Sequence, residues 1–206
     1  MPQSHNRNSG QANALGALQS PVTAQELADW LALDSADPLL NPMLLTATDA
    51  VIRRLGYDLL ARDWIYTLWD WPVVGTPTSP SLTRQASELD RVIDLPYAKV
   101  ISLDSVTSYG AAVTGAVARQ DDVALPRGIE RYAYQINDDP ALVFEYRAGF
   151  GETADDVPES IKTAIKQLAG FLYEHRGACD AADAMQKSGA SVMLTPWTRP
   201  ANVVVW

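Results

Sequence analysis

The sequence predicts an α+β fold: a small helical bundle with an antiparallel β insert and extended N- and C-terminal arms. Apolar residues recur at helical spacing in two stretches near the N-terminus and again after residue 157, whereas the stretch between them alternates like strands. The order helix, helix, strands, helix does not alternate as a βαβ fold would. We expect an N-terminal arm over residues 1–21, a main domain over 22–187 with the β insert at about 62–147, and a C-terminal tail over 188–206.

The first helix is expected at about residues 23–33. Thr23 and Glu26 have the spacing of a capping box, and Val22 with Leu27 fits a hydrophobic staple. Trp30 lies on the same helical face as Leu27. This spacing predicts Trp30 to be a core residue.

The second helix is expected at about residues 42–56. Asn41 would be its N-cap and Pro42 its first helical residue, where the missing N–H of proline does no harm. Gly56 provides a plausible end, since glycine adopts the left-handed conformation that often terminates a helix.

The β insert is read from alternation and turn signals. "DWIYTLWDW", "RVIDLP" and "AKVISLDSVTSYG" read as strands, and "AAVTGAVARQDDVALPRG" as a strand with a loop. "RYAYQI" and "ALVFEYRA" flank the turn signal "NDDP" and predict a hairpin. The prolines between Pro72 and Pro80 predict a long exposed loop.

The third helix is expected at about residues 158–176. Its apolar stripe is Ile161, Ile165, Leu168 and Leu172, and Pro158 suits its first turn. After a weaker helical piece, the segment "SGASVMLTPWTRPANVVVW" reads as a tail with apolar anchors and not as a helix.

Composition excludes several classes of function. The net charge of −9 opposes binding of the free chain to duplex DNA. Cys179 is the only cysteine, so no internal disulfide can form, and we expect it to be a small buried residue. We see neither a secretion-signal pattern nor an apolar run long enough to span a membrane.

The stretch "EYRAGFGETADDVPESIKTAI" raises the question of a phosphate or metal site. Gly149 and Gly151 lack the further glycine or lysine of a phosphate-binding loop, and the carboxylates of Glu152, Asp155 and Asp156 would repel a phosphate. These carboxylates do not have the spacing of a calcium loop. We therefore expect no cofactor and a turn that joins a strand to a helix.

Histidine and serine patterns do not indicate a catalytic site either. The two histidines are His5, in the polar arm, and His175, near the end of the third helix, where a capping or interfacial role is expected. One cysteine and no paired histidines make a zinc site unexpected. No serine lies in a Gly-x-Ser-x-Gly motif.

Several tryptophans lie where their own strand or tail cannot bury them all. Trp64, Trp69 and Trp71 fall in or beside one strand, whose alternation cannot place all three on one face. Trp197 and Trp206 lie in the tail, which either docks on a partner or folds back on its own domain. The residues alone leave these two possibilities open.

Taken in order, these segments resemble the head–tail connector proteins of tailed bacteriophages, also called adaptor or head-completion proteins. The resemblance runs from about Val22 to Arg199 and is carried by "VTAQELADWLAL", "TATDAVIRRLGYDLLARDW", "IDLPYAKVISLDSVTSYG" and "LTPWTRP". Its most specific part is an Ala-Gly-aromatic-Gly turn followed by Asp-Val-Pro, a helix and Tyr-Glu-x-Arg. The matching positions are Ala148, Gly149, Phe150, Gly151, Asp156, Val157, Pro158, Ile161, Tyr173, Glu174 and Arg176.

The resemblance implies a non-enzymatic virion protein that forms a ring of about a dozen copies under the portal. The ring would extend the DNA channel, without sequence-specific DNA binding, and would contact the next neck or tail component. The family's C-terminal segment commonly reaches the portal, which implies docking residues Met193, Leu194, Pro196, Trp197, Arg199 and Trp206. We also expect subunit or neck contacts at Trp69, Trp71, Phe150, Glu152, Asp155, Asp156, His175 and Arg176.

Two alternatives remain at this stage. One is another ring-forming neck protein, such as a stopper or a tail terminator. The other is a metal-dependent hydrolase with an acidic site, which predicts bound Mg²⁺ or Ca²⁺ near Glu152 and Asp156. For the adaptor, we expect the protein in the host cytoplasm during assembly and then at the head–tail interface of the virion.

Overall fold

The computed structural model describes residues 10–35, 37–69, 92–97, 99–126, 140–175 and 181–198. The chain divides into two compact units. The β unit contains the strand near the N-terminus and the strands of Arg62–Ala148, and the helical unit contains Gly16–Ala61 and Gly149–Val203. Helices and antiparallel sheets thus occupy separate parts of the chain, which confirms the predicted α+β class.

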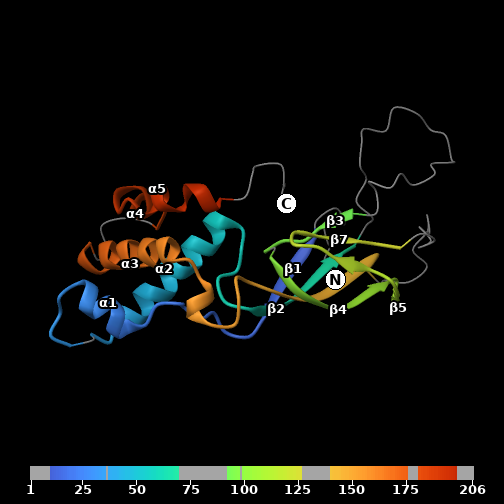
Figure 1. The fold of residues 1–206 in the computed structure, drawn as a ribbon, viewed down its shortest axis with the longest axis horizontal. Coiled ribbons are helices and arrows are strands. Elements are labelled where there is room, and N and C mark those ends of the chain that lie inside the picture. The colour runs from blue at the N-terminus through green and yellow to red at the C-terminus, as the bar shows by residue number, and fades with distance from the viewer. Residues whose placement is uncertain are drawn as a thin grey trace, which may run out of the picture. The chain divides into compact units, whose positions relative to one another are not determined.

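The β unit contains a five-stranded and a three-stranded sheet, both antiparallel (Figure 1). The larger has the order β1-β2-β8-β4-β5 and the smaller the order β3-β7-β6. The bounds are β1 Gln11–Leu15, β2 Arg62–Leu68, β3 Val92–Asp94, β4 Val100–Ser108, β5 Ala111–Ala112, β6 Val117–Ala118, β7 Asp122–Ala124 and β8 Leu142–Ala148. The strand β1 lies in the predicted N-terminal arm, for which the sequence predicted no strand.

The two sheets share one apolar core. Every second residue of β8 points into it, from Leu142 to Ala148. Trp64 of β2 is buried, stacks on Tyr97 at 4.1 Å between ring centroids and lies under the Arg62 guanidinium. The Tyr146 hydroxyl donates a hydrogen bond to the carbonyl of Pro96. These contacts hold the Leu-Pro turn of "IDLPYAK" against the core.

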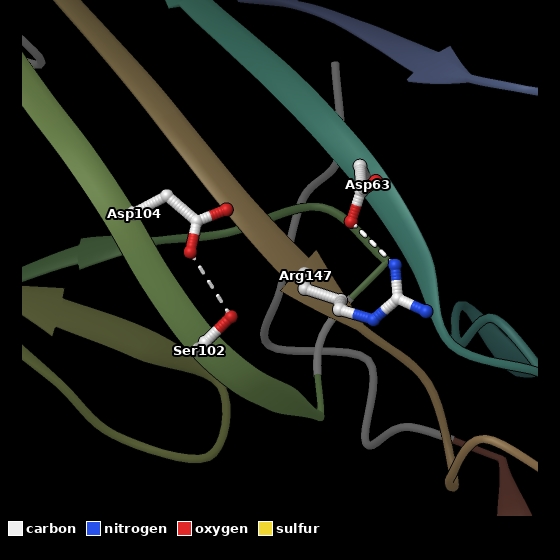
Figure 2. Close-up of polar contacts among 4 residues, drawn as sticks. All are labelled: Asp63, Ser102, Asp104 and Arg147. Atoms are coloured by element: carbon white, nitrogen blue, oxygen red, sulfur yellow. Dashed lines mark hydrogen bonds and ion pairs between the residues drawn. The ribbon is translucent and has the colours of Figure 1, made fainter.

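The opposite face of the larger sheet carries polar contacts (Figure 2). Arg147 of β8 pairs with Asp63 of β2, its register partner, at 2.7 Å between Nη1 and Oδ1. On β4 the Ser102 hydroxyl donates to Asp104 across 3.2 Å. Because Arg147 and Asp63 are partly exposed, this pair contributes little to stability, about 1 kcal/mol or less. The Arg147–Asp63 pair lies on the side of the sheet that faces solvent.

The helical unit is built around the packed pair α2, Leu40–Leu55, and α3, Glu159–Glu174. The remaining pieces are α1 Ala24–Trp30, the 3₁₀ turns η2 Ala154–Asp156 and η3 Thr195–Trp197, and the short helices α4 Ala181–Lys187 and α5 Ala190–Leu194. Figure 1 shows α1 on one side of the α2–α3 pair and α4 with α5 on the other. Among the described residues, none of the helices combines the length and hydropathy that crossing a bilayer requires.

Two of the predicted helix ends are confirmed. Thr23 and Glu26 form the capping box of α1, and the staple residues Val22 and Leu27 are both buried. Gly56 ends α2 in the left-handed conformation at φ 73°.

Two other details of the helices were predicted wrongly. The helix α2 begins at Leu40 instead of Pro42, because Leu40 is fully buried and the N–H of Leu39 finds an acceptor in the Asp37 carboxylate at 2.8 Å. Trp30 is not a core residue and is 52% exposed. The α2–α3 pair meets α1 through Leu27 and Ala28, which are fully buried.

Candidate interaction site at the glycine turn and the C-terminal helix

The glycine turn after β8 packs against the segment that joins α2 to β2. Phe150 N–H donates to the Leu59 carbonyl at 3.2 Å, and Ala61 N–H donates to the Gly151 carbonyl at 2.8 Å. Gly149 has φ +152°, and a Cβ on it would lie 2.7 Å from the carbonyl carbon of Leu60. Both the dihedral angle and the close backbone approach therefore require glycine at position 149.

Phe150 links this turn to the C-terminal segment. Its ring packs edge-on against Tyr57, at 6.4 Å between centroids, and against Trp197, at 6.1 Å. The indole N–H of Trp197 donates to the Ser160 hydroxyl, 3.0 Å away in the first turn of α3. Phe150 and Trp197 thus join three segments of the helical unit, and each remains partly exposed.

The acidic connector, residues 152–156, is a capped turn. Thr153 and Asp156 form the capping box of η2, in which the N–H and the hydroxyl of Thr153 each donate to Asp156 Oδ2 at 2.9 Å. Gly151 leaves room for this carboxylate, because a Cβ at position 151 would lie 2.4 Å from the Asp156 side chain. The hydrogen bonds from Thr153 hold the pKa of Asp156 below its usual value of 3.8.

This lowered pKa has a testable consequence for stability. A carboxyl whose pKa is lower in the folded state stabilises the protein fully above its ordinary pKa and loses that contribution as the pH falls through the folded value. We expect Asp156→Asn to be less stable than the wild type at neutral pH, and the difference to shrink well below pH 3.8. Urea unfolding at a series of pH values measures this difference.

Asp155→Asn is the matched control, because Asp155 is an exposed carboxylate in the same turn but is not the capping residue. At neutral pH its free energy of unfolding should be closer to that of the wild type than that of Asp156→Asn is. An Asp156→Asn deficit that stayed constant down to acid pH would contradict an ionic cap.

The described residues contain no group of three or more histidine, cysteine, aspartate or glutamate side chains placed to hold a metal ion. The Asp156 carboxylate accepts hydrogen bonds from the N–H and the hydroxyl of Thr153, and Asp155 and Glu152 are exposed. The geometry of the stretch is that of a strand-to-helix connector.

The C-terminal segment folds back on its own helical unit as far as Thr198. Ala190–Leu194 is a helix, so the prediction of a non-helical tail was wrong for these residues. Leu194 is fully buried, as is Ala190, since α5 packs on α3. A side chain that is already buried in its own unit cannot supply a docking anchor, which removes Leu194 from the predicted portal contacts.

The other predicted docking residues divide by exposure. Pro196 is exposed, and Met193 and Trp197 are partly buried. Arg199 and Trp206 lie outside the described residues, as do Trp71, Arg176 and the strand predicted at "RYAYQI".

His175 has the capping role that its position predicted. It is the C-cap of α3, and its Nδ1 lies 3.0 Å from the Phe171 carbonyl oxygen. Its ring stacks on Phe171 at 4.1 Å and is otherwise exposed. Trp69 is partly buried just after β2.

The sequence reading did not predict the exposure of Val192 and Trp30, which are among the exposed large apolar residues of the helical unit. Val192 of α5 is 74% exposed, and Trp30 of α1 is 52% exposed. Helical periodicity could have placed Val192 opposite Leu194 had α5 been recognised as a helix. For Trp30 the sequence gives no sign of exposure, because Trp30 shares a face of α1 with the buried Leu27.

The described residues form an α+β protein, and the polar side chains of Thr23, Asp156 and His175 lie at the ends of helices or turns. Three solved structures share this fold. A structure described as "Virion of native gene transfer agent (GTA) particle" matches with a TM-score of 0.67 and 18% identity over 94% of this chain and 97% of that chain.

The other two structures are described as necks of the same kind of particle. "Neck of empty GTA particle computed with C6 symmetry" matches with a TM-score of 0.67, and "Neck of native GTA particle computed with C12 symmetry" with 0.61. Both are 18% identical over 94% of this chain and 98% of that chain. No protein-family model and no curated protein sequence matches the chain.

Proposed function

We propose that this chain is a structural protein of the neck of a phage-like particle, an adaptor that forms a ring beneath the portal. The observation that carries this proposal is the likeness of fold to neck structures over nearly the whole length of both chains. The ordered match of sequence motifs to phage connector proteins supports the same role. It is a structural role, and the virion is where the protein would act.

The proposed oligomer is a closed ring. The matching necks were computed with sixfold and twelvefold symmetry, which fits a ring of about a dozen copies. With a net charge of −9 per copy, such a ring would carry roughly a hundred excess negative charges. A negative lumen repels the DNA backbone and lets it pass without binding.

Binding to isolated portal separates the adaptor from its nearest alternatives. We expect the purified chain to co-sediment with assembled portal and to appear as a ring stacked on it by electron microscopy. A stopper or tail terminator would form rings but require another neck component before joining the portal. A monomer that binds neither portal nor any neck component would contradict the proposed function.

The docking surface is proposed within the C-terminal part of the chain. Pro196 and Met193 remain accessible there, and Arg199 and Trp206 come after the described residues. Trp197 is partly exposed and stays a proposed docking residue, although it also packs on the helical unit. Leu194 is fully buried, so its replacement would act on docking through the fold.

A further inference from the structure

A groove on the helical unit has the features of a binding surface. It has a volume of about 630 Å³ and lies between the second half of α2 and the segment from α4 to η3. Met185 and the exposed Val192 supply apolar surface, and Arg53 and Arg54 supply positive charge. Arg53 is already paired with Asp49 at 2.9 Å. Arg54 forms no ion pair with any described residue, so it is available to a carboxylate.

The groove therefore fits an apolar side chain that has an acidic side chain as its neighbour. Trp30 and Asp29, at the end of α1, are such a pair. Trp30 is 52% exposed, and Asp29 beside it is also exposed. Among the described residues, the Asp29 carboxylate accepts a hydrogen bond from the Gln25 side chain, at 2.8 Å. Exposed tryptophans are frequent anchors of protein interfaces, because the ring buries a large area with few rotatable bonds.

The groove and the Trp30 pair belong to different elements of the helical unit: the groove is lined by α2, α4, α5 and η3, and Trp30 ends α1. The helix α1 packs on one side of the α2–α3 pair, and α4 and α5 cover the other side (Figure 1). The next residue, Leu31, fixes the end of α1 on α3, since its Cδ2 would be 3.0 Å from a Cβ at Gly170. Trp30 therefore cannot fill the groove of its own chain, but it can fill that of a second copy.

We propose that Trp30 and Asp29 of one copy dock into the groove of the next copy, with Trp30 against Val192 and Met185 and Asp29 facing Arg54. Copies with a net charge of −9 repel one another at long range, so a contact between them needs such a local pairing of opposite charges. Two different patches of one unit give a head-to-tail contact, which repeats until a ring closes. This interface rests on the proposed function, since it names the subunit contact of the proposed ring.

Assembly measured by analytical ultracentrifugation tests the contact. We expect Trp30→Ala and Val192→Asp each to weaken subunit association at least tenfold while the circular dichroism spectrum stays unchanged. Asp29→Arg and Arg54→Asp should each weaken it, and the two together should restore it. Leu45→Ala is the matched control, because Leu45 is an exposed apolar residue of α2 outside the groove, at 42% exposure.

A disulfide test gives the direction of the contact independently of affinity. In a Cys179→Ala background, a chain carrying both Asp29→Cys and Arg54→Cys should form a ladder of disulfide-linked oligomers. Mixing the two single variants should yield dimers linked through one cysteine of each kind. The control pair Leu45→Cys and Arg54→Cys should yield no ladder.

The outcomes distinguish this interface from the proposed function. A ring that forms normally from Trp30→Ala and from Val192→Asp would overturn the interface and leave the neck assignment intact. A wild-type chain that stays monomeric and gives no cross-link, both alone and with assembled portal, would overturn both the interface and the ring.

Discussion

Gly149→Ala is expected to lower the free energy of unfolding by about 3 kcal/mol or more. Two effects add at this position. An alanine would have to adopt φ +152°, a conformation that non-glycine residues enter only at about 1–3 kcal/mol. Its Cβ would also lie 2.7–2.8 Å from backbone atoms of Leu60 and Ala61, which cannot rotate away. Equilibrium unfolding in urea measures the loss.

Gly189→Ala is the matched control for this prediction. Gly189 also has a positive φ, +77°, but nothing lies within 4 Å of the position a Cβ would take. Its replacement should therefore show the conformational strain alone, about 1–2 kcal/mol. Equal losses at the two positions would mean that the close approach of the glycine turn to Leu60 does not contribute.

Ending the chain at Gly189 is expected to destabilise the helical unit by about 4–6 kcal/mol, since it removes the buried Leu194, the Trp197 ring and the hydrogen bond of that ring to Ser160. Domains of ordinary stability have only about 5–15 kcal/mol in total. The family resemblance alone would suggest the opposite, a detachable docking tail whose loss abolishes portal binding and leaves the domain folded. Thermal unfolding followed by circular dichroism distinguishes the two expectations.

A chain ending at Thr198 is the matched control, because it keeps α5 and η3 and lacks only residues 199–206. It should retain the wild-type unfolding temperature. Only this shorter deletion can test portal docking, since loss of docking in the chain that ends at Gly189 would report unfolding. A stably folded chain ending at Gly189 would contradict the structural role of α5.

Local features were the ones that the sequence predicted well. The capping box of Thr23 and Glu26 involves residues three positions apart, and Gly56 ends a helix through its own dihedral angle. The acidic connector was correctly read as a turn between a strand and a helix. Its signals, the glycine pair and the acidic residues before α3, all lie within the connector itself. The stretch "ALVFEYRA" was likewise correctly read as a strand, β8.

Features that depend on distant partners were not predictable in this way. The strand β1 pairs with β2, which lies about fifty positions further along the chain, and its own sequence, QANAL, has little strand signal. Trp30 shares a helical face with core residues but lies beyond the area that α2 and α3 cover. The sequence left open whether the C-terminal segment docks on a partner or folds back on its own domain. The packing of Leu194 and Trp197 on the helical unit shows that the segment folds back as far as Thr198.

The amino-acid sequence by itself determined the α+β class, the capping box of α1 and the presence of a turn between β8 and α3, because the signals for each lie in residues close together in the chain. Only the tertiary structure decided that the C-terminal helix belongs to the core of the helical unit and that Trp30 faces outward. The physical reason is that burial is a property of the assembled surface. A side chain is covered only when an element from elsewhere in the chain arrives over it.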